Sequence, residues 1–200
     1  MDENELQKLT KKERKELRRQ EKKGFEESKR KFKIFKKALF WAIGIVAVVG
    51  FIAAIIWFLW QSERNRPGMV FPTQGRDHIA VGSSHSAYNS NPPTSGSHYA
   101  DEAQWGAHEQ ELPDEQLIHN LEHGGIWISY KDIDQSTKTK IEILAKQYPD
   151  KIIVTPRANN DAKIAVASWT RLLKLDQFDE GKIVDFIKAN KNKSPEPNAQ

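Results

Sequence analysis

The longest run of residues without a charge, the 23 positions 38–60, constrains this chain more than any other feature of its sequence. Helical residues rise about 1.5 Å each, so ALFWAIGIVAVVGFIAAIIWFLW can cross a hydrocarbon core of about 30 Å. Trp41, Trp57 and Trp60 lie toward its ends, where tryptophan prefers the membrane interface. A buried globular helix is the alternative, but such helices seldom exceed about 20 residues without a polar side chain. We therefore predict one transmembrane helix over residues 38–60.

The charges on either side of this run predict its orientation. Lys33, Lys36 and Lys37 precede it, whereas only Arg64 and Arg66 follow soon after it. By the positive-inside rule, residues 1–37 form a basic cytoplasmic tail and the remainder lies outside the cell membrane. A cleaved signal peptide fits less well, because the basic preface is long and the following QSERNRPG has no small-x-small cleavage site. We expect a single-pass protein with an extracytoplasmic domain.

The basic tail favours the membrane over nucleic acid as a partner. Residues 1–37 hold 15 Lys/Arg and 8 Asp/Glu, a net charge of +7, and the remainder carries −3. Each basic residue near a bilayer interacts with anionic headgroups by about 1 kcal/mol. The interspersed glutamates and the adjacent membrane disfavour nucleic-acid binding. The chain has no cysteine, which excludes disulfides and thiolate metal ligands.

The predicted extracytoplasmic domain, residues 61–192, has two parts of different composition. Residues 61–113 are rich in Gly, Pro, Ser and Asn, as a loop is, yet they contain four of the six histidines. From residue 114 the hydrophobic periodicity becomes regular. It predicts helices over 114–123, 136–148 and 179–191, with Ser136 as an N-cap, and strands over 126–130, 151–156 and 163–169.

The order of these elements predicts the fold class. A strand, a helix and a strand in succession indicate a parallel pair, and a third strand is added across a short Asn-rich turn. We expect an α+β fold, with a small mixed sheet, flanking helices and a long Gly/Pro-rich segment, preceded by one transmembrane helix. Residues 193–200, KSPEPNAQ, are expected to form a disordered tail.

Four strings in this domain carry a family resemblance: PPTSGSHY at 92–99, IHNLEHG at 118–124, VTPR at 154–157 and AVASW at 165–169. Together they resemble a bacterial family known as domain of unknown function 3105. The resemblance covers roughly residues 66–197 and implies a membrane-anchored or secreted protein. It leaves His85 and His108 outside the family pattern, which falls on His78, Tyr88, Pro92, Pro93, Thr94, Ser95, Gly96, His98, His119, Glu122, His123, Gly124, Tyr130 and Trp169.

The H-x-x-E-H string on the helix predicted over 114–123 indicates a metal site. With about 100° between successive residues, His119 and His123 lie about 40° apart and opposite the apolar side of the helix. If the Gly/Pro-rich segment folds over this polar side, it brings His78 and His98 to the same place. An imidazole cluster without thiolates suits Zn, Cu(II) or Ni(II), and Glu122 is expected to orient a histidine or to be a ligand itself. We therefore expect a transition metal bound by His78, His98, His119 and His123, with Glu122.

Two alternatives remain open at this point. H-x-x-E-H is also the zinc signature of the inverted metalloproteases, in which the glutamate is the general base, so a metal-dependent hydrolase is one alternative. The helix is expected to stop at Gly124, which disfavours that enzyme class, and we expect a binding protein rather than an enzyme. The other alternative is a metal-free module in which Tyr88, Tyr99 and Trp105 line a groove for an envelope protein or a glycan.

Overall fold

The computed structural model describes residues 10–198, and the chain divides into two compact units, Met1–Arg64 and Asn65–Gln200. The boundary lies a few residues beyond the end of the predicted span. Each unit is described by itself.

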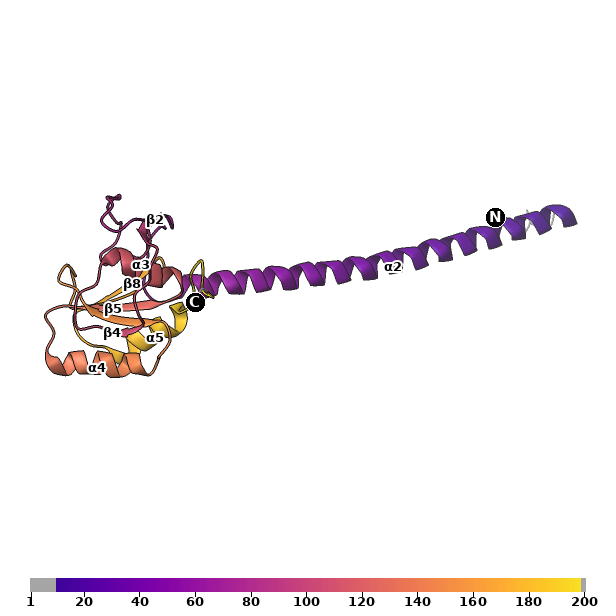
Figure 1. Ribbon diagram of the computed structural model, residues 1–200. Coiled ribbons are helices and arrows are strands. Elements are labelled where there is room, and N and C mark those ends of the chain that lie inside the picture. Colours follow the sequence, from indigo (N-terminus) through magenta and orange to yellow (C-terminus); the bar gives the residue numbers. More distant parts are fainter. Residues whose placement is uncertain (1–9, 199–200) are drawn as a thin grey trace. The chain divides into compact units, whose positions relative to one another are not determined.

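The first unit is one continuous helix, α2 (Lys11–Arg64), of 54 residues (Figure 1). It begins with a capping box, in which the Thr10 backbone N–H donates to Glu13 Oε2 at 2.8 Å and Glu13 N–H donates to Thr10 Oγ1 at 3.5 Å. None of its described side chains is buried in the protein, and its apolar middle part makes it a candidate membrane span by length and composition. The predicted span and much of the basic tail therefore belong to a single helix.

The second unit is built on a six-stranded mixed sheet, which confirms the α+β prediction. The strands lie in the order β1 (Met69–Val70), β8 (Arg171–Leu175), β7 (Ile164–Ser168), β5 (Ile126–Tyr130), β6 (Ile152–Pro156), β4 (Gly106–Ala107). The predicted parallel pair is β5 and β6. The third predicted strand, β7, follows β6 in the chain but pairs antiparallel with β5, because the free edge of β6 is taken by β4. The sequence did not predict β8, whose RLLKL pattern is short and only partly alternating.

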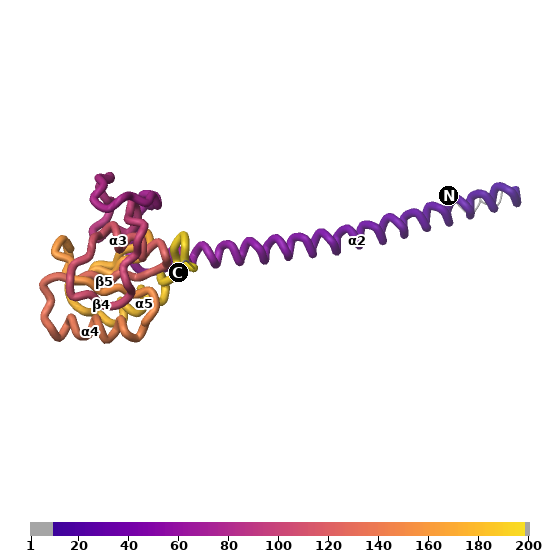
Figure 2. Tube along the Cα trace, in the orientation of Figure 1, coloured from indigo at the N-terminus to yellow at the C-terminus, as the bar shows by residue number. Residues whose placement is uncertain are grey.

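Helices cover both faces of this sheet (Figures 1 and 2). One core contains Ile126 and Ile128 of β5 and packs against α4 (Gln135–Lys146) and α5 (Glu180–Asn190). The other contains Trp127 and packs against α3 (Asp114–Glu122). Both faces of β5 are thus covered, which explains why all five of its residues are buried.

One local expectation needs correction. The N-cap of α4 is Asp134, not Ser136: the Asp134 carboxylate accepts the Thr137 backbone N–H at 2.9 Å, and Ser136 Oγ donates to the same carboxylate at 2.6 Å. A carboxylate two residues upstream can accept several donors at once, so it takes the capping position. The disordered tail from residue 193 stays a prediction; among the described residues there, Glu196 N–H donates to Glu122 O at 3.2 Å, and Lys151 Nζ donates to Pro197 O.

The position of α4 on the sheet gives a test of the fold. Ile141 is fully buried, whereas Ile143 on the same helix is 54% exposed. Ile141→Ala leaves a cavity in the core, and we expect it to lower the unfolding free energy of a soluble fragment 62–200 by about 2–5 kcal/mol. Ile143→Ala is the matched control and should change it by no more than about 0.5 kcal/mol. Denaturant unfolding of both variants measures this; equal losses would show that α4 is not packed as described.

Candidate metal centre

Helix α3 has one apolar and one polar side, as its sequence predicts. Leu117, Ile118 and Leu121 lie on the side that faces the sheet and are completely buried in the core there. His119 and Glu122 lie on the other side and are only 5% and 2% exposed, because the Gly/Pro-rich segment covers them. The helix thus buries polar side chains on the face that its apolar pattern leaves free.

Polar contacts at two points fix α3 in the domain. Arg157 donates two hydrogen bonds of 2.7 Å to the carboxylate of Asp114, the first residue of the helix. Asn120 clamps the covering segment: its Oδ1 accepts the Ala103 N–H and its Nδ2 donates to Ala103 O, both at 2.9 Å. The clamp ties the segment to the helix one residue from His119.

Two short strands bring the remaining histidines to α3. β2 (His78–Ile79) and β3 (His98–Tyr99) form a separate parallel pair in which His78 is the register partner of His98. The Tyr99 carbonyl oxygen then accepts a hydrogen bond from His119 Nδ1 at 2.8 Å. Composition alone predicted a loop here, since strands of two residues give no periodic pattern.

The PPTSG turn positions His98. Gly96 has φ of +123°, and a Cβ at this position would lie 3.0 Å from the ring of Tyr88. Its carbonyl oxygen accepts a hydrogen bond from His98 Nδ1 at 2.7 Å. The Tyr88 hydroxyl donates to Ser97 O at 2.7 Å, on the other side of the same turn. The turn therefore holds a fully buried imidazole by its own backbone.

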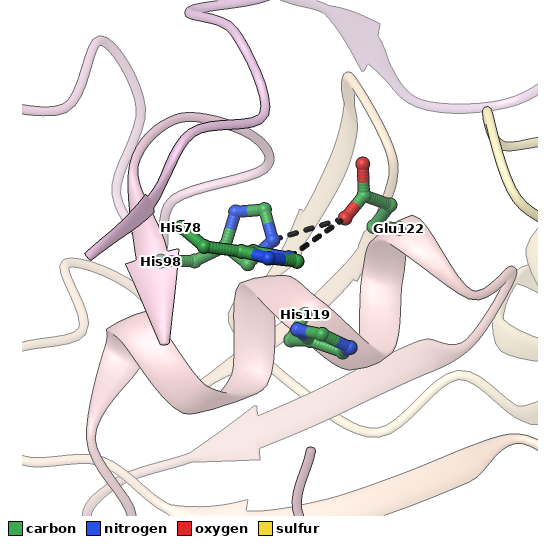
Figure 3. Close-up of side chains that lie close together, drawn as sticks. All are labelled: His78, His98, His119 and Glu122. Carbon is green, nitrogen blue, oxygen red and sulfur yellow. Dashed lines mark hydrogen bonds and ion pairs between the residues drawn. The ribbon is translucent and has the colours of Figure 1, made fainter. Parts of the chain in front are cut away.

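Three histidines and one glutamate meet where these elements converge (Figure 3). We call His78, His98, His119 and Glu122 the inner group; their ligand atoms all lie within 4.8 Å of one another. Glu122 Oε2 is 3.0 Å from His98 Nε2 and 3.9 Å from His78 Nε2. The rings of His78 and His119 are stacked, with centroids 5.1 Å apart. Four of the five predicted site residues thus come together in a cluster that could hold a metal ion.

His123, the fifth predicted residue, lies in a neighbouring cluster. Its Nδ1 lies 2.9 Å from Glu102 Oε2, and its ring centroid is 4.4 Å from that of His119. Glu102, His119 and His123, which we call the outer group, also offer ligand atoms within 4.8 Å of one another. Glu102 was not predicted, because an isolated glutamate in DEAQW carries no sequence signal for a ligand.

The backbone selects the tautomer of the buried histidines. A carbonyl oxygen can only accept, so Nδ1 of both His98 and His119 must carry the proton. Their Nε2 atoms are left to face the cluster. Histidines that bind metals commonly donate their second ring N–H to a carbonyl or a carboxylate in this way, which fixes the ring and raises its basicity.

Burial favours the metal-binding form of His119. Desolvation lowers the pKa of His119, and the neighbouring His123, His98 and His78 lower it further, while the hydrogen bond to the Tyr99 carbonyl opposes the shift. A metal binds the neutral imidazole, so a lowered pKa keeps this ligand available at neutral pH. Arg76, also not predicted, lies with Nη1 3.6 Å from Glu122 Oε1 and partly balances the carboxylate charge.

The cluster dimensions fit a first-row metal after a modest contraction. Bonds of about 2.0–2.1 Å place tetrahedral ligand atoms about 3.3 Å apart. The His98–Glu122 contact of 3.0 Å is close to that spacing, but the widest separation of up to 4.8 Å is not. The side chain of His78 is 51% exposed and comes from a two-residue strand, so it is the ligand with room to move inward.

The two remaining histidines lie outside both groups, as expected. His85 contacts Ser86 O at 2.8 Å and Glu115 Oε1 at 3.1 Å, and these contacts raise its pKa. His108 Nε2 contacts Gln104 O at 2.8 Å. Both are engaged in local hydrogen bonds.

Comparison with known proteins identifies the family. Residues 80–200 match the family described as Protein of unknown function (DUF3105). The chain belongs to this family. The match covers His98, His119, Glu122 and His123, whereas His78 lies just before it. No curated protein and no solved structure matches the chain.

In this DUF3105 protein, Tyr88 and Trp105 make different packing contacts. Trp105 lines a cavity of about 470 Å³ together with Glu102, Lys151 and Lys191. Tyr88 packs against the core and Gly96 instead, and the ring of Trp105 occupies the space beside Gly125, where a Cβ would lie 2.6 Å from it. The groove formed by Tyr88, Tyr99 and Trp105 stays a prediction.

The Asn120 clamp gives a test of how the cluster is held. Asn120→Ala leaves the buried N–H and C=O of Ala103 without their partner, and we expect it to lower the unfolding free energy of fragment 62–200 by about 2 kcal/mol or more. Asn159→Ala, at an exposed position, is the matched control and should cost less than about 0.5 kcal/mol. An Asn120→Ala variant as stable as the control would contradict the clamp.

Proposed function

We propose that this protein is anchored in the membrane by α2 and binds a transition-metal ion outside the cytoplasm through His78, His98, His119 and Glu122. The proposal makes metal binding, rather than turnover, the property of the domain. Three neutral imidazoles and a carboxylate suit Zn²⁺, Cu²⁺ or Ni²⁺, and the absence of cysteine disfavours Cu⁺.

The contact between His98 and Glu122 carries the proposal. His98 Nδ1 is committed to the Gly96 carbonyl, so Nε2 of the neutral ring has a lone pair rather than a proton. This nitrogen lies 3.0 Å from a carboxylate oxygen in a buried site, and two acceptors at that distance repel each other. Either a second proton or a metal ion must lie between them. A buried imidazolium–carboxylate pair pays a large desolvation cost, whereas a metal ion uses both donors and His78 and His119 as well.

The composition of the covering segment supports the same conclusion. Residues 66–113 bury few apolar side chains, so the free energy that orders them must come partly from elsewhere. Metal binding to a site that is absent from the unfolded chain contributes directly to folding, by about 10 kcal/mol for structural zinc. An ion bound between β2, β3 and α3 would connect the segment to the rest of the domain.

The hydrolase alternative is less well supported. A metalloprotease of the H-x-x-E-H type needs its glutamate free to act as a general base on water. Here Glu122 contacts His98, His78 and Arg76, which favours a role as a ligand.

Metal content tests this proposal. Purified fragment 62–200, reconstituted in turn with Zn²⁺, Cu²⁺ and Ni²⁺, should retain close to one ion of at least one of them per chain after buffer exchange, measured by elemental analysis. His119→Gln should lose nearly all of it, because His119 belongs to both groups. His108→Gln, at a histidine outside the cluster, is the control and should retain the ion. A folded wild-type fragment that holds none of the three metals would contradict the proposal.

The membrane orientation is a separate part of the proposal. Within the described residues, positions 10–37 hold 14 Lys/Arg and 5 Glu, a net charge of +9 before the apolar run begins. The positive-inside rule keeps such a segment in the cytoplasm and sends residues 61–200 across the membrane.

Because the chain has no cysteine, single introduced cysteines report the orientation cleanly. A membrane-impermeant maleimide applied to intact bacteria, with the outer membrane permeabilised where one is present, should label Ser83→Cys and leave Ser28→Cys unlabelled until the inner membrane is disrupted. Both serines are exposed in the protein, so accessibility depends only on the membrane. Labelling of Ser28→Cys alone would reverse the orientation, and labelling of both in intact cells would contradict a cytoplasmic tail.

A further inference from the structure

The outer group raises the question of whether the domain holds a second metal. His119 belongs to both groups, with His98, His78 and Glu122 on one side and His123 and Glu102 on the other. The Tyr99 carbonyl occupies His119 Nδ1, so only Nε2 is available for a metal. One nitrogen lone pair binds one ion, and His119 cannot bridge two.

We infer that the site offers one ion two overlapping coordination positions, an inner one (His78, His98, His119, Glu122) and an outer one (Glu102, His119, His123), between which it moves while His119 remains bound. This inference rests on the proposed metal binding and adds the route by which the ion is exchanged.

Exposure along the cluster supports a route with two open ends. The rings of His78, His119 and His123 follow one another, with centroid separations of 5.1 and 4.4 Å. The side chain of His78 is 51% exposed at one end, and that of Glu102 is 34% exposed at the other. His98 and His119 lie between them and are 0% and 5% exposed. An ion at the buried centre therefore has ligands that lead to solvent in two directions.

The ligand sets of the two positions predict which of them binds the ion more tightly. The inner group supplies three imidazoles and a carboxylate, whereas the outer group supplies two imidazoles and a carboxylate. The inner position should hold the ion more tightly, because it has one more imidazole. The outer position borders the cavity lined by Glu102, Trp105 and Lys151, and a small molecule from solvent can reach the ion there.

Exchange through the outer position requires only small movements. His123 Nδ1 already contacts Glu102 Oε2 at 2.9 Å, so the two donors are near the spacing of adjacent metal ligands. His119 stays where the Tyr99 carbonyl holds it. The ion gains Glu102 and His123 as it leaves His98 and Glu122, and it is never without protein ligands.

Zn²⁺ titration of the full chain in detergent micelles, with a competing chromophoric chelator, tests the inference. The wild type should bind one ion, not two. His98→Gln removes an inner ligand and should weaken binding by about 100-fold or more while leaving one titratable ion per chain. Adding Glu102→Gln to that variant should abolish the residual binding, as His119→Gln alone does. His108→Gln is the control.

Two further readouts test the outer position, and the second tests whether Glu102 is a metal ligand or only orients a neighbouring side chain. The Cu²⁺ spin-resonance spectrum should show coupling to three imidazole nitrogens in the wild type and to two in a His78→Gln/His98→Gln double variant, where His119 and His123 hold the ion; without an outer position only His119 would remain. Release of Zn²⁺ to excess chelator should be about 2-fold slower or more in Glu102→Gln than in the wild type, because one of the two exits is lost and only the exit past His78 remains. This variant changes a partly exposed residue, so it decides the matter even if His98→Gln does not fold.

The outcomes distinguish the inference from the function on which it rests. No Zn²⁺ or Cu²⁺ bound by the wild type would overturn both. Three results together would leave metal binding in place and overturn the two positions. The wild type would bind one ion per chain, His98→Gln would bind as little Zn²⁺ as His119→Gln, and Glu102→Gln would release Zn²⁺ at the wild-type rate. Two ions per wild-type chain would also overturn them, because the positions would then be separate sites.

Discussion

Two backbone carbonyls, Gly96 O and Tyr99 O, hold Nδ1 of His98 and His119, and the rest of the site depends on these hydrogen bonds. They fix the tautomer of each ring and direct both Nε2 atoms toward Glu122 and His78. The first bond forms within the PPTSG turn, whereas the second can form only when β3 lies across α3. The unusual composition of residues 66–113 therefore serves to deliver backbone acceptors to imidazole donors at defined positions.

The sheet makes this arrangement possible by occupying the other side of α3. Leu117, Ile118 and Leu121 pack on the core that contains Trp127, so the polar side of the helix faces away from the sheet. Polar side chains buried on that side need partners, and in this domain the partners come from the covering segment and from one another. Arg157 and Asn120 fix the helix and the segment in the same frame. The cluster of histidines and Glu122 is thus a consequence of how an amphipathic helix satisfies its polar side.

The sequence predicts those features that depend on local periodicity. The spacing of Leu117, Leu121, His119 and His123 is enough to place the histidines opposite the core, and the Gly124 turn that ends α3 has φ of +84° as expected. The parallel pairing of β5 and β6 follows from the order of strand, helix and strand. These predictions require only the geometry of one element or one connection.

Long-range register explains what the sequence could not predict. The pairing of His78 with His98 arises between two strands of two residues each, which leave no hydrophobic pattern. Glu102 and Arg76 reach the cluster only because the segment bends over α3, and nothing in their neighbours' identity marks them. The place of β7 beside β5 depends on which edge of the β5–β6 pair remains free. The N-cap of α4 depends on which of two acceptors, Asp134 or Ser136, takes the capping position.

The central claim is that an ion binds between the Nε2 atoms of His98 and His119 and the carboxylate of Glu122. A crystal structure of the zinc-loaded domain, with anomalous diffraction measured on both sides of the zinc absorption edge, tests it most directly. We expect one strong anomalous peak about 2.0–2.2 Å from each of these three ligand atoms, with His78 drawn inward and both Nδ1 contacts retained. A zinc-saturated crystal without a peak there, in which His98 Nε2 still contacts Glu122 directly at about 3 Å, would contradict it.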